Sequence, residues 1–170
     1  MSDNVYNLPY NFIPATKCEY LLFSIPNPSI NMNSNFKELL IIDDDCCHNI
    51  VCALALKKVF RSSKVNMTCF TDSEEGLDYI LQSAASSQKT LVLLDINMPR
   101  LNGWEVLERL EQLPRAVRKH LDVYVLTASP NKRDEYRASK NSVVKQYLQK
   151  PLSNHLQSIF IDSSIQLSVA

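Results

Sequence analysis

Polar side chains follow four apolar segments of the sequence, at points where buried strands would end. Residues 91–94 (Leu-Val-Leu-Leu) are typical of a strand buried on both faces, and Asp95 follows them directly. Three other segments end in the same way, before Asp43-Asp44-Asp45, before Thr127 and before Lys150. Because ligands bind in the crevice beyond the carboxyl ends of parallel strands, we expect these groups to meet at one edge of a sheet.

Asp43, Asp44 and Asp95 would bring three negative charges into that crevice. Two such charges ~4 Å apart repel by about 4 kcal/mol at an effective dielectric constant near ~20. A fold that gathers them therefore favours a bound cation, and carboxylate oxygens with open positions for water suit Mg²⁺. A carboxylate can also attack phosphorus to form an acyl phosphate, so Asp95 is a candidate nucleophile with Lys150 as the neighbouring cation.

From Phe36 onward, strand patterns and helix patterns alternate along the chain. This alternation predicts right-handed crossovers and a parallel sheet. The predicted strands are about Glu38–Ile42, Val65–Phe70, Leu91–Asp95, Leu121–Leu126 and Lys145–Gln149. The predicted helices are Cys46–Phe60, one that begins at Asp72 or Ser73, Gly103–Gln112, Lys132–Ser139 and Leu152–Ser163, with a loop or short turn from Pro114 to His120.

The apolar residues of each predicted helix indicate which face is buried. The residues expected to point inward are Ile50, Val51, Leu54, Ala55 and Val59, then Leu77, Ile80 and Leu81, then Trp104, Leu107 and Leu110, and finally Leu152, Leu156, Ile159 and Phe160. The segment Lys132–Ser139 offers little besides Tyr136 and Ala138 to bury. We therefore expect this helix to sit loosely on the sheet.

The composition is that of an ordinary globular protein. The 170 residues have room for one α/β domain and a short appendage. Lys plus Arg and Asp plus Glu each total 18, so the net charge gives no sign of nucleic-acid binding. No apolar run is long enough to span a membrane, and the segment Tyr20–Ile25 is too short for the core of a signal peptide. These features favour a cytoplasmic location without a membrane partner.

The cysteines also favour a reducing compartment, because their number, 5, is odd. Cys46, Cys47 and Cys52 lie close to His48, but no Cys-x-x-Cys pair is present. Free cysteine is among the most buried residue types. We therefore interpret these cysteines as packed residues of the first helix and not as a metal or redox site.

Residues 1–35 differ from the rest of the chain. They hold Pro9, Pro14, Pro26 and Pro28 out of 8 prolines, many asparagines and almost no charge. The segment from Lys17 to Phe23 is compatible with an extra strand or a docking peptide, and equally with a loosely attached tail. Translation from Met32 is a third possibility, because the residues after it make a plausible start for the domain.

The polar groups at successive strand ends resemble those of the receiver domain of two-component response regulators. The matching residues are Asp43-Asp44, Asp95, Thr127 and Lys150-Pro151. The resemblance runs from about Phe36 to about Ser163. It implies a flavodoxin-like α/β fold, a doubly wound parallel sheet of five strands in the order 2-1-3-4-5 with five helices. It also divides the chain into an N-terminal extension of uncertain structure (1–35), a receiver domain (36–163) and a short C-terminal tail (164–170).

The resemblance implies roles for the groups around the expected phosphorylation site. Asp95 would be the phosphoacceptor, and Thr127 would donate a hydrogen bond to a phosphoryl oxygen. Lys150 would supply the positive charge, aimed by a cis peptide bond to Pro151. Tyr147 matches the family's aromatic switch position, so its ring would turn inward when Thr127 moves towards the phosphoryl group.

A magnesium site is also implied by the resemblance. Its direct ligands would be Asp44, Asp95 and the backbone carbonyl of Asn97, while Asp43 would act mainly through water. Asp45 falls outside the matched acidic pair. We therefore expect Asp45 to cap the first helix instead.

The resemblance implies a single-domain response regulator of the chemotaxis-regulator kind, a signalling domain and not an enzyme in the usual sense. Its partners would be a histidine kinase or histidine phosphotransfer protein and an unidentified downstream protein. The downstream protein would read the face made by residues 132–139, 145–149 and 152–163. One alternative is an aspartate-nucleophile phosphatase of the haloacid dehalogenase type, although Asn97 replaces the second aspartate of that motif. A second alternative is a pseudo-receiver that only scaffolds, although every phosphorylation residue is present.

Overall fold

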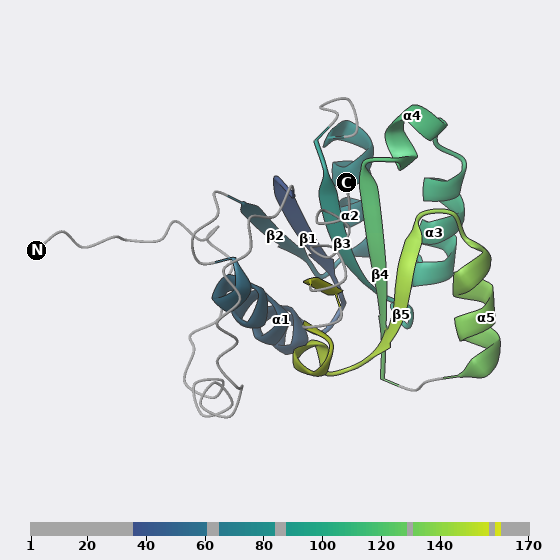
Figure 1. Cartoon of the computed structure of the whole chain (residues 1–170). Coiled ribbons are helices and arrows are strands. Elements are labelled where there is room, and N and C mark those ends of the chain that lie inside the picture. The colour runs from purple at the N-terminus through teal and green to yellow at the C-terminus, as the bar shows by residue number, and fades with distance from the viewer. Residues whose placement is uncertain (1–35, 61–64, 84–87, 129–130, 157–158, 161–170) are drawn as a thin grey trace, which may run out of the picture.

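Five parallel strands form one sheet in the order β2-β1-β3-β4-β5 (Figure 1). The computed structural model describes residues 36–60, 65–83, 88–128, 131–156 and 159–160. The sheet order and the helices that cover it confirm the predicted flavodoxin-like fold. The expectations for residues 1–35, 161–163 and 164–170 lie outside the described residues.

The observed elements lie close to the predicted ones. The strands are β1 (Glu38–Ile42), β2 (Asn66–Phe70), β3 (Thr90–Asp95), β4 (Leu121–Thr127) and β5 (Val144–Gln149). The helices are α1 (Cys46–Val59), α2 (Ser73–Ser83), α3 (Gly103–Glu111), α4 (Arg115–Arg118) and α5 (Lys132–Lys140). The predicted helix from Leu152 begins instead as a 3-10 turn, η3 (Leu152–Asn154), and residues 156, 159 and 160 are helical. The predicted loop or turn from Pro114 contains the short helix α4.

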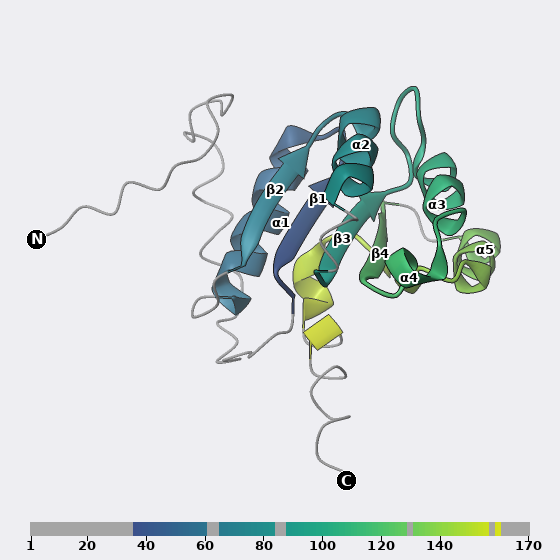
Figure 2. The same ribbon diagram turned by 90° about the horizontal axis from the view of Figure 1, so that it is seen from above.

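Helices cover both faces of the sheet (Figure 2). On one face, α1 packs against alternate side chains of the strands, including Leu39, Leu91 and Leu93. The same cluster contains Leu152, Leu156, Ile159 and Phe160. On the other face, α2 and α3 pack against the intervening side chains, including Leu40, Val92 and Leu94. All residues of β1, β3 and β4 are buried, as expected of runs of aliphatic side chains in a sheet covered on both sides.

Side chains at the helix starts satisfy the free backbone amides there. Asp45 accepts hydrogen bonds from the amides of Cys47 and His48, which confirms it as the cap of α1. Asp72 accepts from the amides of Glu74 and Glu75 at the start of α2, so Asp72 and not Ser73 is the cap.

The buried face of α1 is rotated from the predicted one. Ile50, Val51 and Leu54 are only half-buried, so that prediction was wrong, whereas Ala55 and Val59 are buried as expected. The other buried residues of α1 are Asn49, Cys52 and Leu56. The physical cause is the side chain of Asn49, which donates to the carbonyls of Asp43 (2.8 Å) and Phe70 (3.2 Å) and fixes the rotation of the helix.

Several other side chains differ from the expected burial. Leu81 is 41% exposed because it lies one residue beyond the buried face that ends with Ile80. Trp104 is half-buried. Cys46 and Cys47 are exposed in the first turn of α1, so only Cys52 of this group is buried as expected. The expected burial of Leu107, Leu110, Leu152, Leu156, Ile159 and Phe160 is confirmed.

The helix α5 has few apolar anchors, as predicted. Ala138 is its buried residue, and Tyr136 is 65% exposed, contrary to the expectation that it would be buried. Arg137 connects α5 to α3 instead, because its guanidinium lies 2.7 Å from Glu108 and stacks 4.3 Å from the centre of the Trp104 ring. Polar and cation–π contacts therefore hold α5 against α3.

Candidate phosphorylation site

The register of the sheet brings the polar strand ends to one edge, at the lower ends of the strands in Figure 1. Ile42 pairs with Leu94, so Asp43, which follows β1, lies level with Asp95, the last residue of the neighbouring β3. Thr127, the last residue of β4, pairs with Gln149, which directly precedes Lys150. The residues that the sequence placed at four strand ends thus share this edge.

Asp43, Asp44 and Asp95 form a carboxylate cluster at this edge. One oxygen from each lies within 4.8 Å of the others. Asp43 and Asp95 are buried, whereas Asp44 is exposed. The cluster therefore has two shielded charges and one side open to water.

Lys150 lies between the two buried carboxylates. Its Nζ is 2.7 Å from Oδ2 of Asp43 and 3.2 Å from Oδ1 of Asp95. The Lys150-Pro151 peptide bond is cis, as expected. The backbone amide of Lys150 donates to the carbonyl of Thr127 at 2.8 Å, which ties the start of this segment to the end of β4.

His48 is a contact of the cluster that the sequence did not indicate. Its Nδ1 lies 2.5 Å from Oδ2 of Asp43, the oxygen that Lys150 also contacts. Oδ1 of Asp43 accepts a hydrogen bond of 3.0 Å from the amide of Asp45. The only signal in the sequence is the position of His48 in the first turn after the acidic residues, next to Cys46 and Cys47.

Burial and the contacts between carboxylates and Lys150 shift the pKa values of the ionisable groups of the cluster in opposite directions. Burial would raise the pKa of Asp43, but hydrogen bonds with His48 and Lys150 outweigh it and hold that pKa below its usual value. For Asp95, burial dominates and raises the pKa, with Lys150 only partly opposing it. Burial would lower the pKa of Lys150, but its contacts with Asp43 and Asp95 raise it. Lys150 is therefore a cation at neutral pH.

Thr127 and Tyr147 lie beside the cluster on β4 and β5. Thr127 is buried and Tyr147 is half-buried, packed against the core on the side of α2 and α3. Burial raises the pKa of Tyr147, and the nearby hydroxyl of Thr127 opposes this rise. The two side chains are therefore neighbours, between the carboxylate cluster and α5.

Comparison with known proteins agrees with this geometry. The family profile described as "Response regulator receiver domain" matches residues 39–159. The chain belongs to this family. Its members are signalling domains, and the match covers the five strands, apart from Glu38 at the start of β1, together with the carboxylate cluster. In the part of the chain that the structure describes, no helix is long and apolar enough to cross a membrane.

Individual receiver proteins are similar to the chain over most of its length. The response regulator Rcp1 of Synechocystis is 40% identical over 129 residues, which are 73% of this chain and 82% of Rcp1. A two-component response regulator from Cytophaga hutchinsonii has a crystal structure with a TM-score of 0.63 and 25% identity, covering 78% of this chain and 99% of that one.

Two other matches show only a shared fold or a shared segment. The receiver domain of the histidine kinase CKI1 from Arabidopsis thaliana, solved in complex with Mg²⁺ and BeF₃⁻, has a TM-score of 0.57, covering 76% of this chain and 90% of that one. Its identity is 14%, so the likeness shows a shared fold alone. The chain also matches the phosphodiesterase regA of Dictyostelium discoideum, but it spans only 18% of that protein.

Proposed function

We propose that this receiver domain accepts a phosphoryl group on Asp95 from a phosphohistidine donor, with Mg²⁺, and thereby changes a partner-binding face. The observation that supports this most strongly is the position of Lys150, whose ammonium contacts Asp43 and Asp95 next to the exposed Asp44. The donor would be a histidine kinase or a histidine phosphotransfer protein, and the reader of the changed face a downstream protein. We also propose that the protein is cytoplasmic and binds neither nucleic acid nor a membrane.

The donor set fits Mg²⁺, because it consists of hard carboxylate oxygens with one side open to water. Asp44, Asp95 and the backbone carbonyl of Asn97 would hold the ion. Asp43 would act through water, since both of its oxygens already accept hydrogen bonds from the protein. When bound, the ion would neutralise negative charge on the transferred phosphoryl group.

The proposed reaction needs one nucleophile and a well-placed positive charge. A carboxylate oxygen of Asp95 would attack phosphorus, so that an O–P bond forms while the N–P bond to the donor imidazole breaks. Lys150 would move its ammonium from the carboxylates to a phosphoryl oxygen. The hydroxyl of Thr127 would donate a hydrogen bond to another phosphoryl oxygen, which draws Thr127 away from Tyr147.

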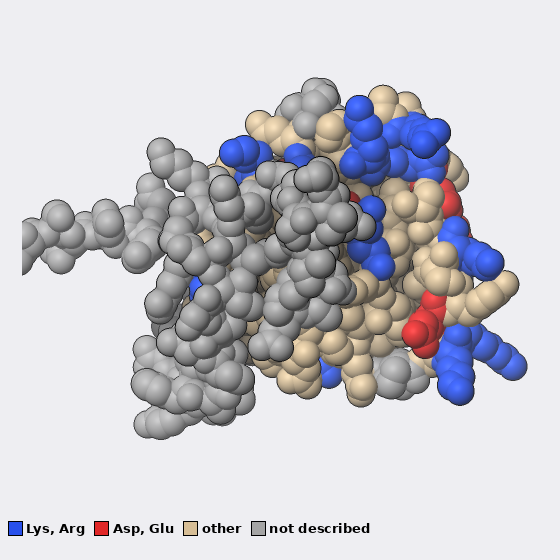
Figure 3. Space-filling view, in the orientation of Figure 1, with Lys and Arg blue, Asp and Glu red and all other residues tan. Residues whose placement is uncertain are grey.

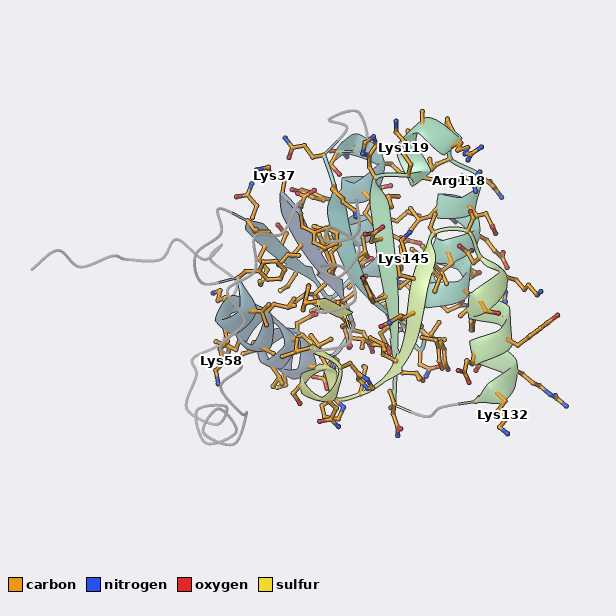
Figure 4. The ribbon with its side chains drawn as sticks, viewed as in Figure 1. Lys37, Lys58, Arg118, Lys119, Lys132 and Lys145 are labelled. Atoms are coloured by element: carbon orange, nitrogen blue, oxygen red, sulfur yellow. The ribbon has the colours of Figure 1, made fainter. Side chains whose placement is uncertain are left out.

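The proposed partner-binding face consists of α5, β5 and the described residues after β5. Few apolar contacts hold α5, so a small change near Thr127 and Tyr147 can alter its position. On this face, Figure 3 shows Lys and Arg side chains along α5, among them Lys132, which Figure 4 labels. A downstream protein with acidic side chains would complement this surface.

Two other functions are weaker alternatives. The phosphatase alternative requires a second catalytic carboxylate two residues after Asp95, where the chain has Asn97. The pseudo-receiver alternative requires that no phosphoryl group is accepted. Mass spectrometry after incubation with acetyl phosphate and Mg²⁺ separates the receiver from the pseudo-receiver: one added phosphoryl group supports our proposal, and an unchanged mass supports the pseudo-receiver. A separate assay tests the phosphatase, which turnover of a phosphomonoester would support.

Asp44→Asn is expected to weaken Mg²⁺ binding by about tenfold or more, because it removes a direct ligand. Mg²⁺ should raise the melting temperature of the unmodified protein and raise that of the variant much less, as measured by thermal denaturation. The matched control is Asp45→Asn, which removes the same charge one residue away and keeps a good helix cap. Equal losses for the two variants would show that the ligand pair is misassigned.

BeF₃⁻ with Mg²⁺ is expected to change amide hydrogen exchange in residues 131–149 more than in α1 and α2. The reason is that a coupling free energy of ~1–3 kcal/mol can shift a helix with as few apolar contacts as α5. Thr127→Val keeps the branched shape of the side chain and removes the hydroxyl, so it should reduce the change while BeF₃⁻ still binds. Changes concentrated in residues 1–35 would instead identify the N-terminal extension as the switch.

A further inference from the structure

The carboxylate of Asp43 contacts three hydrogen-bonding groups of the protein. Its Oδ2 is shared by Nδ1 of His48 at 2.5 Å and Nζ of Lys150 at 2.7 Å, and its Oδ1 accepts from the amide of Asp45. The side chains of His48 and Asp43 are 14% and 3% exposed, so this contact is shielded from bulk water. A hydrogen bond in such surroundings constrains the carboxylate strongly.

A second contact orients the imidazole ring of His48. Sγ of the buried Cys52 lies 3.5 Å from Nε2 of the ring. Burial raises the pKa of Cys52 to about 12, so the thiol keeps its proton and can donate a hydrogen bond to Nε2. The ring then carries its own proton on Nδ1, where it donates to Asp43. Both contacts are satisfied when Nδ1 carries the ring proton and Nε2 accepts.

We propose that His48 is a positioning residue that keeps Asp43 out of direct contact with the metal ion and leaves Lys150 able to move to the phosphoryl group. This inference rests on the proposed phosphotransfer function. When Lys150 leaves Asp43, the side chain of His48 and the amide of Asp45 continue to satisfy that carboxylate.

If the Nδ1–H donor of His48 is removed, the carboxylate of Asp43 can replace the lost hydrogen bond in two ways. Among the side chains that the structure describes, Lys150 would be its remaining donor, so Asp43 would hold Lys150 back from the phosphoryl group. Alternatively, Oδ2 would turn to the metal ion and add a third carboxylate to Asp44 and Asp95. Both changes slow phosphoryl transfer, and the second also strengthens binding of Mg²⁺ in the absence of phosphate.

The test compares His48→Leu, which fills the space without a donor, with His48→Asn, whose amide nitrogen replaces Nδ1 as a donor. Both are made in the full chain. For His48→Leu we expect Mg²⁺ to bind about threefold more tightly by titration calorimetry because Asp43 becomes available as a ligand. We expect phosphorylation by acetyl phosphate to be about tenfold slower. His48→Asn should return both values to within about twofold of the unmodified protein.

Opposite changes in the two measurements separate positioning from a loss of structure, which would weaken both together. His120→Leu is the control, because His120 directly precedes β4 at the opposite edge of the sheet, and it should change neither value. Parallel losses in His48→Leu, no change, or no recovery in His48→Asn would overturn the inference. If the unmodified protein takes up no phosphoryl group, the proposed function fails, while the Mg²⁺ titrations still decide the role of His48.

Discussion

Asp95→Asn is expected to abolish phosphorylation by acetyl phosphate while the protein remains folded. The amide oxygen cannot replace the carboxylate as a nucleophile. Burial and the charge of Asp43 both raise the pKa of Asp95, so the charged form is disfavoured in the folded protein. We therefore expect an equal or higher melting temperature for the variant without Mg²⁺. Intact-mass measurement and thermal denaturation check the two expectations.

The control for this variant is Asp45→Asn. It carries the same chemical change at the start of α1, where asparagine also caps a helix well. It should accept a phosphoryl group at nearly the normal rate. Persistent labelling of Asp95→Asn would show that another residue is the acceptor.

The position of Asp95 could be predicted because strand ends are visible in the sequence. Continuous aliphatic runs before Asp43 and Asp95 indicate strands buried on both faces, and the structure shows such burial along β1 and β3. The polar residue after each run then lies at the carboxyl edge. The order of the strands was not accessible in this way, because hydrophobic periodicity does not record which strands are neighbours. It came from the resemblance to receiver domains.

The contact between His48 and Asp43 could not be predicted because it depends on the rotation of α1. That rotation is set by Asn49, which bonds to the carbonyl of Phe70 at the end of β2, 21 residues away in sequence. Apolar periodicity suggested a different face, with Ile50 and Leu54 inward. A buried polar side chain with two backbone partners outweighed the apolar pattern, since leaving the buried side-chain amide of Asn49 without those partners would cost about 1–3 kcal/mol.

The contacts that hold α5 against α3 also could not be predicted from the sequence, for a different reason. A search for apolar anchors finds few in this helix, and it misses contacts made by charged side chains. Arg137 combines an ion pair with Glu108 and stacking on Trp104. Each partner is on α3, so the contact exists only once the two helices are placed side by side.

Gly103→Ala is expected to destabilise the protein by about 1–3 kcal/mol or more and to slow phosphorylation. The first residue of α3 packs against the backbone that carries the phosphoacceptor: its amide donates to the carbonyl of Ile96 at 3.0 Å. A methyl group on Gly103 would collide with the carbonyl oxygen of Asp95 and lie 2.8 Å from Cα of Ile96. Because backbone atoms cannot rotate away, either α3 or the end of β3 must move, and Asp95 moves with β3. Urea denaturation and the rate of reaction with acetyl phosphate measure the two effects.

The matched control is Gly76→Ala, the same substitution in α2. Its methyl group would lie 2.8 Å from Cδ1, 3.0 Å from Cγ1 and 3.2 Å from Cγ2 of Ile42, so the close contacts are with one side chain and not with backbone atoms. Alanine also favours a helix over glycine by about 1 kcal/mol, which offsets part of the crowding. We therefore expect a smaller loss of stability and little change in phosphorylation. A similar cost for both variants would show that the backbone of Asp95 yields as easily as a side chain, and that α3 does not fix the position of the phosphoacceptor.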